Sequence, residues 1–113
     1  MAYSITTERF TGPLDVLLNL IEDRKLSINE VSLSSVVEEF VKHSRALPHV
    51  TRAEAAAFLA VASTLILIKS RSLLPVMELT SEEESSIGEL ERRLAMLREF
   101  RRLAKPMEGK RRP

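Results

Sequence analysis

The sequence predicts an all-α protein, and three observations support that prediction. The chain is rich in Ala, Leu, Glu and Arg but has only 3 glycines and 4% aromatic residues, a composition typical of helices rather than sheets. Apolar residues recur at helical spacing along most of the chain. Capping-box patterns precede two of these stretches. We therefore expect a small N-terminal bundle of three helices with a long third helix, then a linker and a fourth helix.

The first helix is predicted to begin within the sequence FTGPLD, residues 10–15. Pro13 suits the first turn of a helix, and Asp15 lies near the positive end of the helix dipole. Thr11 or Gly12 is the expected N-cap. An apolar face follows at spacings of i, i+3, i+4 and i+7, formed by Leu14, Leu17, Leu18 and Ile21.

The second helix is predicted to follow a short connector, LSINEVS, that begins at Leu26. We expect the helix to start at Ser32 or at Ser35, because Ser35 and Glu38 form a capping-box pattern. It should end before Leu47, since Pro48 disfavours helical geometry in the residue before it. Its apolar face comprises Leu33, Val36, Val37, Phe40 and Val41.

The third helix has the clearest boundaries. Thr51 and Glu54 form a capping box, which places the helix start at Arg52, and Pro75 stops the helix after about Leu74. Its sequence from residue 55, AAAFLAVASTLILIKSRSLLP, is apolar on every side. The most apolar part, residues 55–68, is shorter than the roughly 20 residues that cross a bilayer. We therefore expect a helix of the protein interior and no membrane association.

A polar linker, residues 76–88, is predicted to separate the N-terminal domain, residues 1–75, from a fourth helix, residues 89–105. This helix carries two apolar rows. One comprises Leu90, Leu94 and Leu97, and the other comprises Met96, Phe100 and Leu103. The basic tail, residues 106–113, has the composition of a disordered segment.

The sequence offers no catalytic or metal-binding pattern. The chain has no cysteine, and its 2 histidines, His43 and His49, are separated by a proline-containing turn. No zinc-ligand spacing, phosphate loop or nucleophile with a His–Asp partner is present. We therefore expect a non-enzymatic protein without a cofactor or metal. The absence of cysteine is compatible with a reducing cytoplasm.

The charge distribution favours nucleic-acid binding in one segment of the chain only. The formal net charge of +1 creates no global attraction for DNA. Residues 91–113 are nonetheless basic, and a single phenylalanine is their only aromatic residue, so they offer no platform for stacking bases. DNA contact is therefore expected to be indirect, or weak and non-specific, through this C-terminal segment.

The all-round apolar character of the third helix requires more partners than the first two helices provide. Each neighbouring helix covers only one side of it at an axial distance of roughly 8–10 Å. The remaining surface can be covered by the fourth helix folding back, by a second copy of the chain, or by another protein. The alanines permit close approach of another helix but do not decide among these three.

One collinear block of the chain, residues 5–75, resembles the N-terminal domain of segregation and condensation protein A (ScpA), the bacterial kleisin family. The block includes F-x-G-P-L-D, the short connector with alternating apolar residues, and the ending I-K-S-R-x-L-L-P. Each motif is weak alone, but their order and spacing make the resemblance specific. The resemblance does not extend to a C-terminal winged helix.

This resemblance implies a role and a set of contacts. Kleisins of this family bind the coiled-coil neck of an SMC ATPase, and the third helix completes a helical bundle with that neck. The implied neck-binding residues are Val37, Phe40, Val41, Phe58, Leu59, Ala62, Leu65, Ile66, Lys69 and Leu73. A contact with the partner protein ScpB is implied for Leu90, Leu94, Leu97 and Arg101. The implied setting is the cytoplasm, in association with the nucleoid, during chromosome condensation and segregation.

Two other classes of function remain open from the residues alone. One is a small DNA-binding regulator, in which two of the helices form a helix-turn-helix. The candidate helices are apolar or acidic on their exposed sides, which disfavours this reading. The other is a helical bundle that associates only with itself. Binding to an SMC head-plus-neck fragment distinguishes the adaptor from both.

Overall fold

The computed structural model describes residues 12–46 and 51–104. These residues form helices and no strands, which confirms the predicted all-α class. The helices are α2 (Pro13–Asp23), α3 (Glu30–Ser35), α4 (Val37–Ala46), α5 (Arg52–Leu73) and α6 (Ser81–Ala104).

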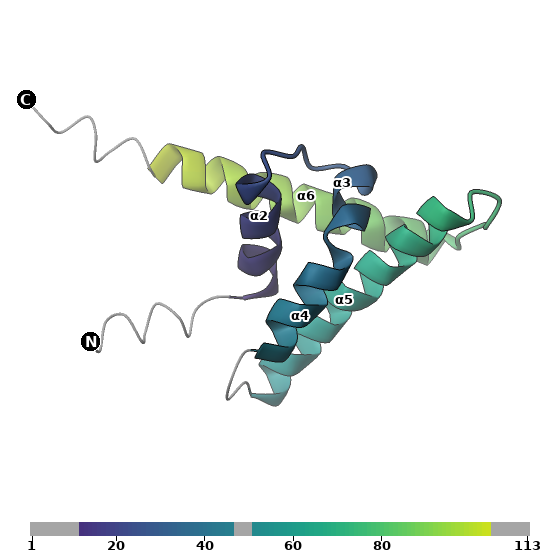
Figure 1. The fold of residues 1–113 in the computed structure, drawn as a ribbon, viewed down its shortest axis with the longest axis horizontal. Helices are drawn as coiled ribbons and strands as arrows, with labels where there is room; N and C mark the ends of the chain where they lie inside the picture. The colour runs from purple at the N-terminus through teal and green to yellow at the C-terminus, as the bar shows by residue number, and fades with distance from the viewer. Residues whose placement is uncertain (1–11, 47–50, 105–113) are drawn as a thin grey trace, which may run out of the picture.

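The two longest helices, α5 and α6, form the arms of a V, with the short loop between them at its apex (Figure 1). Helices α2 and α3 lie between the arms, and α4 runs alongside α5. Helix α5 contacts α2, α3, α4 and α6, whereas α6 contacts α2 as well as α5. Helix α5 is therefore the central element of the described structure.

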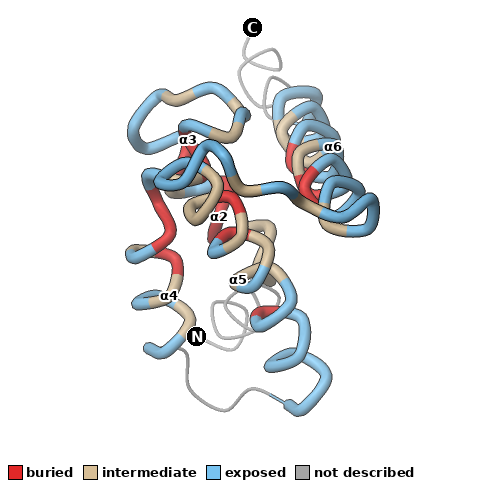
Figure 2. Tube along the Cα trace, turned by 90° about the vertical axis from the view of Figure 1, so that its right-hand side faces the viewer, coloured by how far each residue is buried: buried red, intermediate tan, exposed pale blue. Residues whose placement is uncertain are grey.

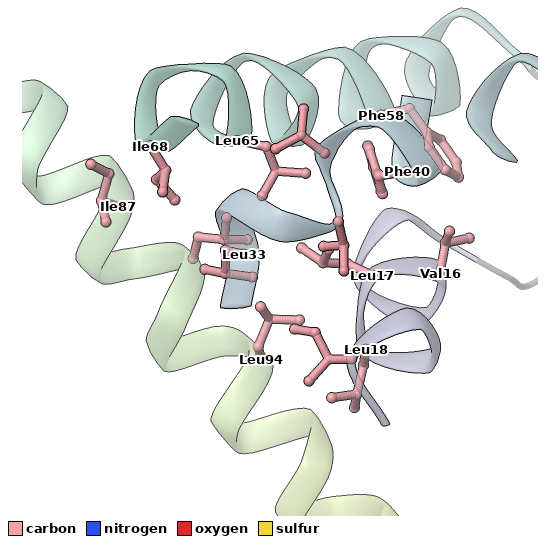
Figure 3. Close-up of a cluster of buried hydrophobic side chains, with 14 residues drawn as sticks. Val16, Leu17, Leu18, Leu33, Phe40, Phe58, Leu65, Ile68, Ile87 and Leu94 are labelled. Carbon is pink, nitrogen blue, oxygen red and sulfur yellow. The ribbon is translucent and has the colours of Figure 1, made fainter. Parts of the chain in front are cut away.

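All five helices contribute to one apolar core (Figure 3). Its buried side chains are Val16, Leu17, Leu18, Ile21, Leu33, Val36, Val37, Phe40, Phe58, Leu65, Ile68, Ile87, Leu90 and Leu94. The last three belong to α6. The fourth helix therefore folds back onto the other helices, and the predicted linker does not separate two independent modules.

Helix α2 begins at Pro13, as predicted, with Gly12 as its N-cap. The Asp15 carboxylate accepts a hydrogen bond from the Gly12 N–H at 3.1 Å. At the other end, the N–H of Lys25 bonds to the carbonyl of Glu22, and the N–H of Leu26 bonds to the carbonyl of Ile21. This pair of bonds is a Schellman motif, and it places Lys25 in the left-handed region, with φ of 56°.

The predicted start of the second helix, at Ser32 or at Ser35, was wrong. Asn29 is the N-cap of α3, and its side chain accepts a hydrogen bond from the Ser32 N–H at 2.8 Å. The Ser35 hydroxyl donates to the Ser32 carbonyl instead of capping a helix. Val36 leaves helical geometry, so the segment divides into α3 and α4. Helix α4 ends at Ala46, in agreement with the predicted end before Leu47.

Helix α5 begins where the capping box predicted. The Thr51 hydroxyl accepts from the Glu54 N–H at 3.1 Å, and the Glu54 carboxylate accepts from the Thr51 N–H at 2.9 Å. The complete helix has 22 residues and is long and apolar enough to cross a membrane by length and composition. The length argument made for residues 55–68 therefore does not apply to the whole helix. A single helix of this kind is weak evidence for a membrane span, and α5 packs against four other helices of the described structure.

Helix α6 begins at Ser81 rather than at Glu89. The Thr80 hydroxyl accepts from the Glu83 N–H at 3.1 Å, and the Glu83 carboxylate accepts from the Thr80 N–H at 2.9 Å. The acidic run at residues 82–84 occupies the first turn, where the positive end of the helix dipole stabilises carboxylates. Much of the predicted linker is therefore helical. The predicted basic tail, residues 106–113, lies outside the described residues.

Candidate partner-binding surface

Helix α5 buries one side in the core and exposes the other. Phe58, Leu65 and Ile68 are its buried residues. Most of the helix is exposed or only partly buried, as Figure 2 shows along its whole length. The prediction that α5 is an interior helix is therefore correct for one side only. An adjoining side, about 100° around the helix axis, is the apolar surface that the sequence left without a partner.

Three large apolar side chains form a row on this adjoining side. Leu59, Ile66 and Leu73 are 67%, 52% and 68% exposed. They are seven residues apart, which is close to two helical turns and keeps them on one side of the helix. Ala62 is half-buried beside them. We call Leu59, Ile66 and Leu73 the α5 row.

The residues that the resemblance implied for neck binding divide into three groups. The α5 row is exposed, and Val41, Ala62 and Lys69 are half-buried. The remaining residues are buried in the core, namely Val37, Phe40, Phe58 and Leu65. The rings of Phe40 and Phe58 stack at a centroid distance of 6.0 Å, which joins α4 to α5 inside the chain. These four side chains are therefore not available to a partner in the described conformation.

Lys69 is committed to an ion pair within the chain. Its Nζ lies 2.7 Å from the Glu38 carboxylate of α4. The hydrogen bond from Lys69, together with its positive charge, holds the pKa of Glu38 below its usual value. The ion pair therefore connects α4 to α5, and the Glu38 carboxylate partly neutralises the charge of Lys69 in the free chain.

Arg71, in the last turn of α5, joins three helices. Its guanidinium lies 2.8 Å from the Glu30 carboxylate of α3 and 2.7 Å from the Glu84 carboxylate of α6. These hydrogen bonds, that from Glu30 first, raise the pKa of Arg71. Burial raises the pKa of the neighbouring Glu91, and the negative charge of Glu30 raises it further. The cluster fixes the orientation of α5 relative to α3 and α6.

The residues implied for the ScpB contact face the inside of the chain. Leu90 and Leu94 are buried, and Leu97 is half-buried against the core. Arg101 forms ion pairs with Asp15 and Glu22 of α2. That surface of α6 is therefore already occupied by the rest of the chain.

The other apolar row of α6 is exposed instead. Met96, Phe100 and Leu103 are 64%, 68% and 65% exposed. The sequence showed this row but assigned no contact to it, because helical periodicity alone does not distinguish which of two rows packs inward. We call Met96, Phe100 and Leu103 the outer α6 row.

Several arginines of α6 are already paired along the helix. Arg92 and Arg93 form ion pairs with Glu89, and Arg102 forms one with Glu99. These pairs reduce the positive potential of the described helix, so they weaken its attraction for phosphate groups. The rest of the basic segment, from Lys105 onward, lies outside the described residues.

In the described part of the chain, no group of three or more His, Cys, Asp or Glu side chains is arranged to hold a metal ion. His43 is exposed in the last turn of α4, and His49 lies outside the described residues. The described surface carries the two apolar rows and, outside them, the exposed apolar side chains of Val31, Leu74 and Val76.

The fold and these rows define a small all-α domain with exposed apolar helix faces. Residues 20–111 match the family described as segregation and condensation protein ScpA. The chain belongs to this family. Its match extends through α6, beyond the block in which the sequence motifs were recognised.

Several curated relatives carry the name segregation and condensation protein A. The relative from Caldanaerobacter subterraneus subsp. tengcongensis is 31% identical over 111 residues, which cover 95% of this chain and 45% of the relative. The relative from Exiguobacterium sibiricum is 37% identical over 73% of this chain and 33% of its own length. The relative from Streptococcus mitis is 34% identical over 94% of this chain and 44% of its own length. The chain thus spans less than half the length of these relatives. No solved structure matches the chain at a comparable level.

Proposed function

We propose that the chain is a kleisin-type subunit that binds the coiled-coil neck of an SMC ATPase through the α5 row. In this role it acts without catalysis of its own, in chromosome segregation and condensation. The observation that supports the proposal is the seven-residue spacing of Leu59, Ile66 and Leu73 on the exposed side of a helix whose other side is in the core. In coiled coils two positions of every seven, a and d, face the partner helix. The α5 row supplies one of these positions, and Ala62 and Lys69, three residues after Leu59 and Ile66, occupy the other.

The energetics favour a helical partner. Burying a Leu or Ile side chain that was exposed contributes about 1.5–3 kcal/mol. Leu59, Ile66 and Leu73 are 67%, 52% and 68% exposed, so a partner helix can recover about half to two-thirds of that amount at each of the three sites. Ala55, Ala62 and Ser63 flank the row with small side chains, which allow the axes of two helices to approach closely.

We propose a second contact, with ScpB, through the outer α6 row. The inner residues first assigned to this contact, such as Leu94, pack against the chain itself. Met96, Phe100 and Leu103 lie on the same helix and are exposed. The proposed ScpB contact therefore lies on the helix that the resemblance implied, but on its exposed side rather than on the side of Leu94.

The neck contact is tested by binding of the chain to a purified SMC head-plus-neck fragment, measured by calorimetry. Ile66→Glu should weaken binding by at least about tenfold, equivalent to roughly 1.4 kcal/mol, because a charge would be buried in a helix–helix contact. Ala60→Glu is the matched control, because Ala60 is exposed on α5 outside the row. Both variants should keep their helicity, as judged by circular dichroism.

The two proposed contacts are distinguished by measuring the binding of two variants to both the SMC fragment and purified ScpB. Phe100→Glu should weaken binding to ScpB and leave binding to the SMC fragment unchanged, whereas Ile66→Glu should do the opposite. Absence of binding between the unmodified chain and the SMC fragment would contradict the proposed function. Equal binding by the Ile66→Glu and Ala60→Glu variants would show that the α5 row is not the contact surface.

A further inference from the structure

A small apolar pocket lies between the C-terminal half of α4 and the N-terminal half of α5, with a volume of about 250 Å³. Its inner lining comes from Val41, Phe58 and Ala62, which are buried or half-buried. Ala55 and Leu59, which are exposed, contribute to its rim. Pockets for drug-sized ligands have volumes of about 300–1,000 Å³, so this one is better matched to a single protein side chain.

The pocket adjoins the α5 row. Leu59 belongs to the row and also lines the pocket, and Ala62 lies beside the row and lines the pocket as well. Ala55 and Ala62 are seven residues apart, and their small side chains leave the space that a bulkier residue would fill. A helix packed along the α5 row would therefore pass over the pocket.

The surroundings of the pocket carry positive charge. Arg45 lines it and is exposed, and within the described residues it forms no ion pair. Lys42 and Arg52 are exposed on the same parts of α4 and α5. The nearby carboxylate of Glu54 is engaged with the Thr51 N–H. This distribution favours a partner with a carboxylate at the rim.

We propose that the pocket is a socket for one large apolar side chain of the SMC neck helix, and that a carboxylate on the same helix pairs with Arg45. The inference rests on the proposed function, because the helix that covers the α5 row supplies the inserted side chain. Coiled coils likewise insert a side chain of one helix into a hollow on its partner, and here the hollow is formed by two helices, α4 and α5. The pocket then fixes the register of the neck along α5, which the evenly spaced α5 row alone does not determine.

Filling the pocket provides the first test. Ala55→Trp should weaken binding to the SMC head-plus-neck fragment by at least about tenfold, because the indole occupies the space that the neck side chain needs. Ala60→Trp is the matched control, since Ala60 is exposed and lies about 140° around the helix from Ala55. Arg45→Glu should weaken binding by a similar factor of about ten, and one acidic-to-lysine substitution in the neck should restore it.

Labelling provides a second test that does not depend on a large substitution. The chain has no cysteine, so Ala55→Cys and Ala60→Cys each provide a single reactive thiol. Both variants should react quickly with a maleimide in the free chain. In the presence of the SMC fragment, Ala55→Cys should become protected while Ala60→Cys stays reactive.

The outcomes separate the socket from the proposed function. If Ile66→Glu abolishes binding while Ala55→Trp and Arg45→Glu bind normally and Ala55→Cys stays reactive in the complex, the socket is wrong and the α5 contact stands. If the unmodified chain does not bind the fragment, both are wrong. Slow labelling of Ala55→Cys in the free chain would show an internal occupant. A dimer in sedimentation that Ala55→Trp dissociates would show a second copy as occupant, and either result overturns the socket.

Discussion

Arg101, in the last turn of α6, donates a hydrogen bond to the carboxylate of Asp15, in the first turn of α2, over 3.1 Å. The other oxygen of that carboxylate accepts from the Gly12 N–H at the helix start. Arg101 also donates to Asn19 at 2.7 Å and lies 3.3 Å from a carboxylate oxygen of Glu22. One arginine therefore connects the placement of α6 with the beginning of α2, and it holds the outer α6 row on the side away from the core.

Arg101→Ala should lower the free energy of unfolding by about 1 kcal/mol, since the side chain is partly exposed but makes several charge-assisted contacts. Arg102→Ala, which removes an exposed pair with Glu99, should change it by less than about 0.5 kcal/mol. Urea denaturation measures both. In a double-mutant cycle, Asp15→Asn combined with Arg101→Ala should be less costly than the sum of the single changes. Strict additivity would mean that the two residues do not interact.

Leu94→Ala should lower the free energy of unfolding by about 2–5 kcal/mol, because Leu94 is fully buried and truncation leaves a cavity. Phe100→Ala, on the outer α6 row, should cost less than about 0.5 kcal/mol. Chemical denaturation of the two variants compares the inner and outer sides of α6 directly. Similar losses for both would contradict the assignment of the sides.

Gly88→Ala should stabilise the chain by about 0.5–1 kcal/mol, because Gly88 lies inside α6 and a glycine in a helix costs conformational entropy. A Cβ atom at this position would meet nothing within 4 Å. Thermal denaturation followed by circular dichroism measures the gain. A loss of stability would indicate that residue 88 is not helical, as the predicted linker required.

Lys25→Gly introduces a glycine where the backbone is left-handed, whereas Gly88→Ala removes one from a helix. Lys25 has a φ of 56° in the Schellman motif after α2, and a side chain in left-handed geometry costs about 1–2 kcal/mol. Glycine also raises the entropy of the unfolded chain, so a net gain of about 0.5–1 kcal/mol is expected. Lys25→Ala should give no comparable gain. Equal melting temperatures for the glycine and alanine variants would argue against left-handed geometry there.

The stability of the chain should depend on pH in opposite ways at Glu91 and Glu38. Burial raises the pKa of Glu91, so its ionised form disfavours the folded state, and Glu91→Gln should raise the melting temperature at neutral pH. That gain should shrink as pH falls from the raised pKa of Glu91 toward the ordinary glutamate pKa, and it should be absent below the ordinary pKa. The hydrogen bond from Lys69 lowers the pKa of Glu38, so its ionised form favours folding.

Glu38→Gln should accordingly lower the melting temperature at neutral pH. This loss should shrink as pH falls from the ordinary glutamate pKa through the lowered pKa of Glu38, where the native carboxylate also becomes neutral. Melting curves of both variants and the unmodified chain, recorded across the acidic range, measure the two effects. Changes of the same sign at neutral pH would contradict the assigned environments.

Local signals in the sequence determined the helix boundaries that depend on neighbouring residues. Thr51 and Glu54 identified the start of α5, and Pro13 identified the first turn of α2, because capping and proline geometry act within one turn. The equivalent signal at Thr80 and Glu83 was also local, but the glutamates around it were interpreted as a linker. The start of α6 was therefore available from the sequence and missed.

Only the tertiary structure decided which apolar side of each long helix faces inward. Periodicity showed two apolar sides on α5 and two apolar rows on α6, but either side could pack against the remaining helices. Contacts between residues far apart in sequence made the choice, such as Arg101 with Asp15, 86 positions away. Once Leu65 and Leu94 entered the common core, Ile66 and Phe100 were left exposed for a partner, because a helix cannot turn both of its sides toward the same neighbours.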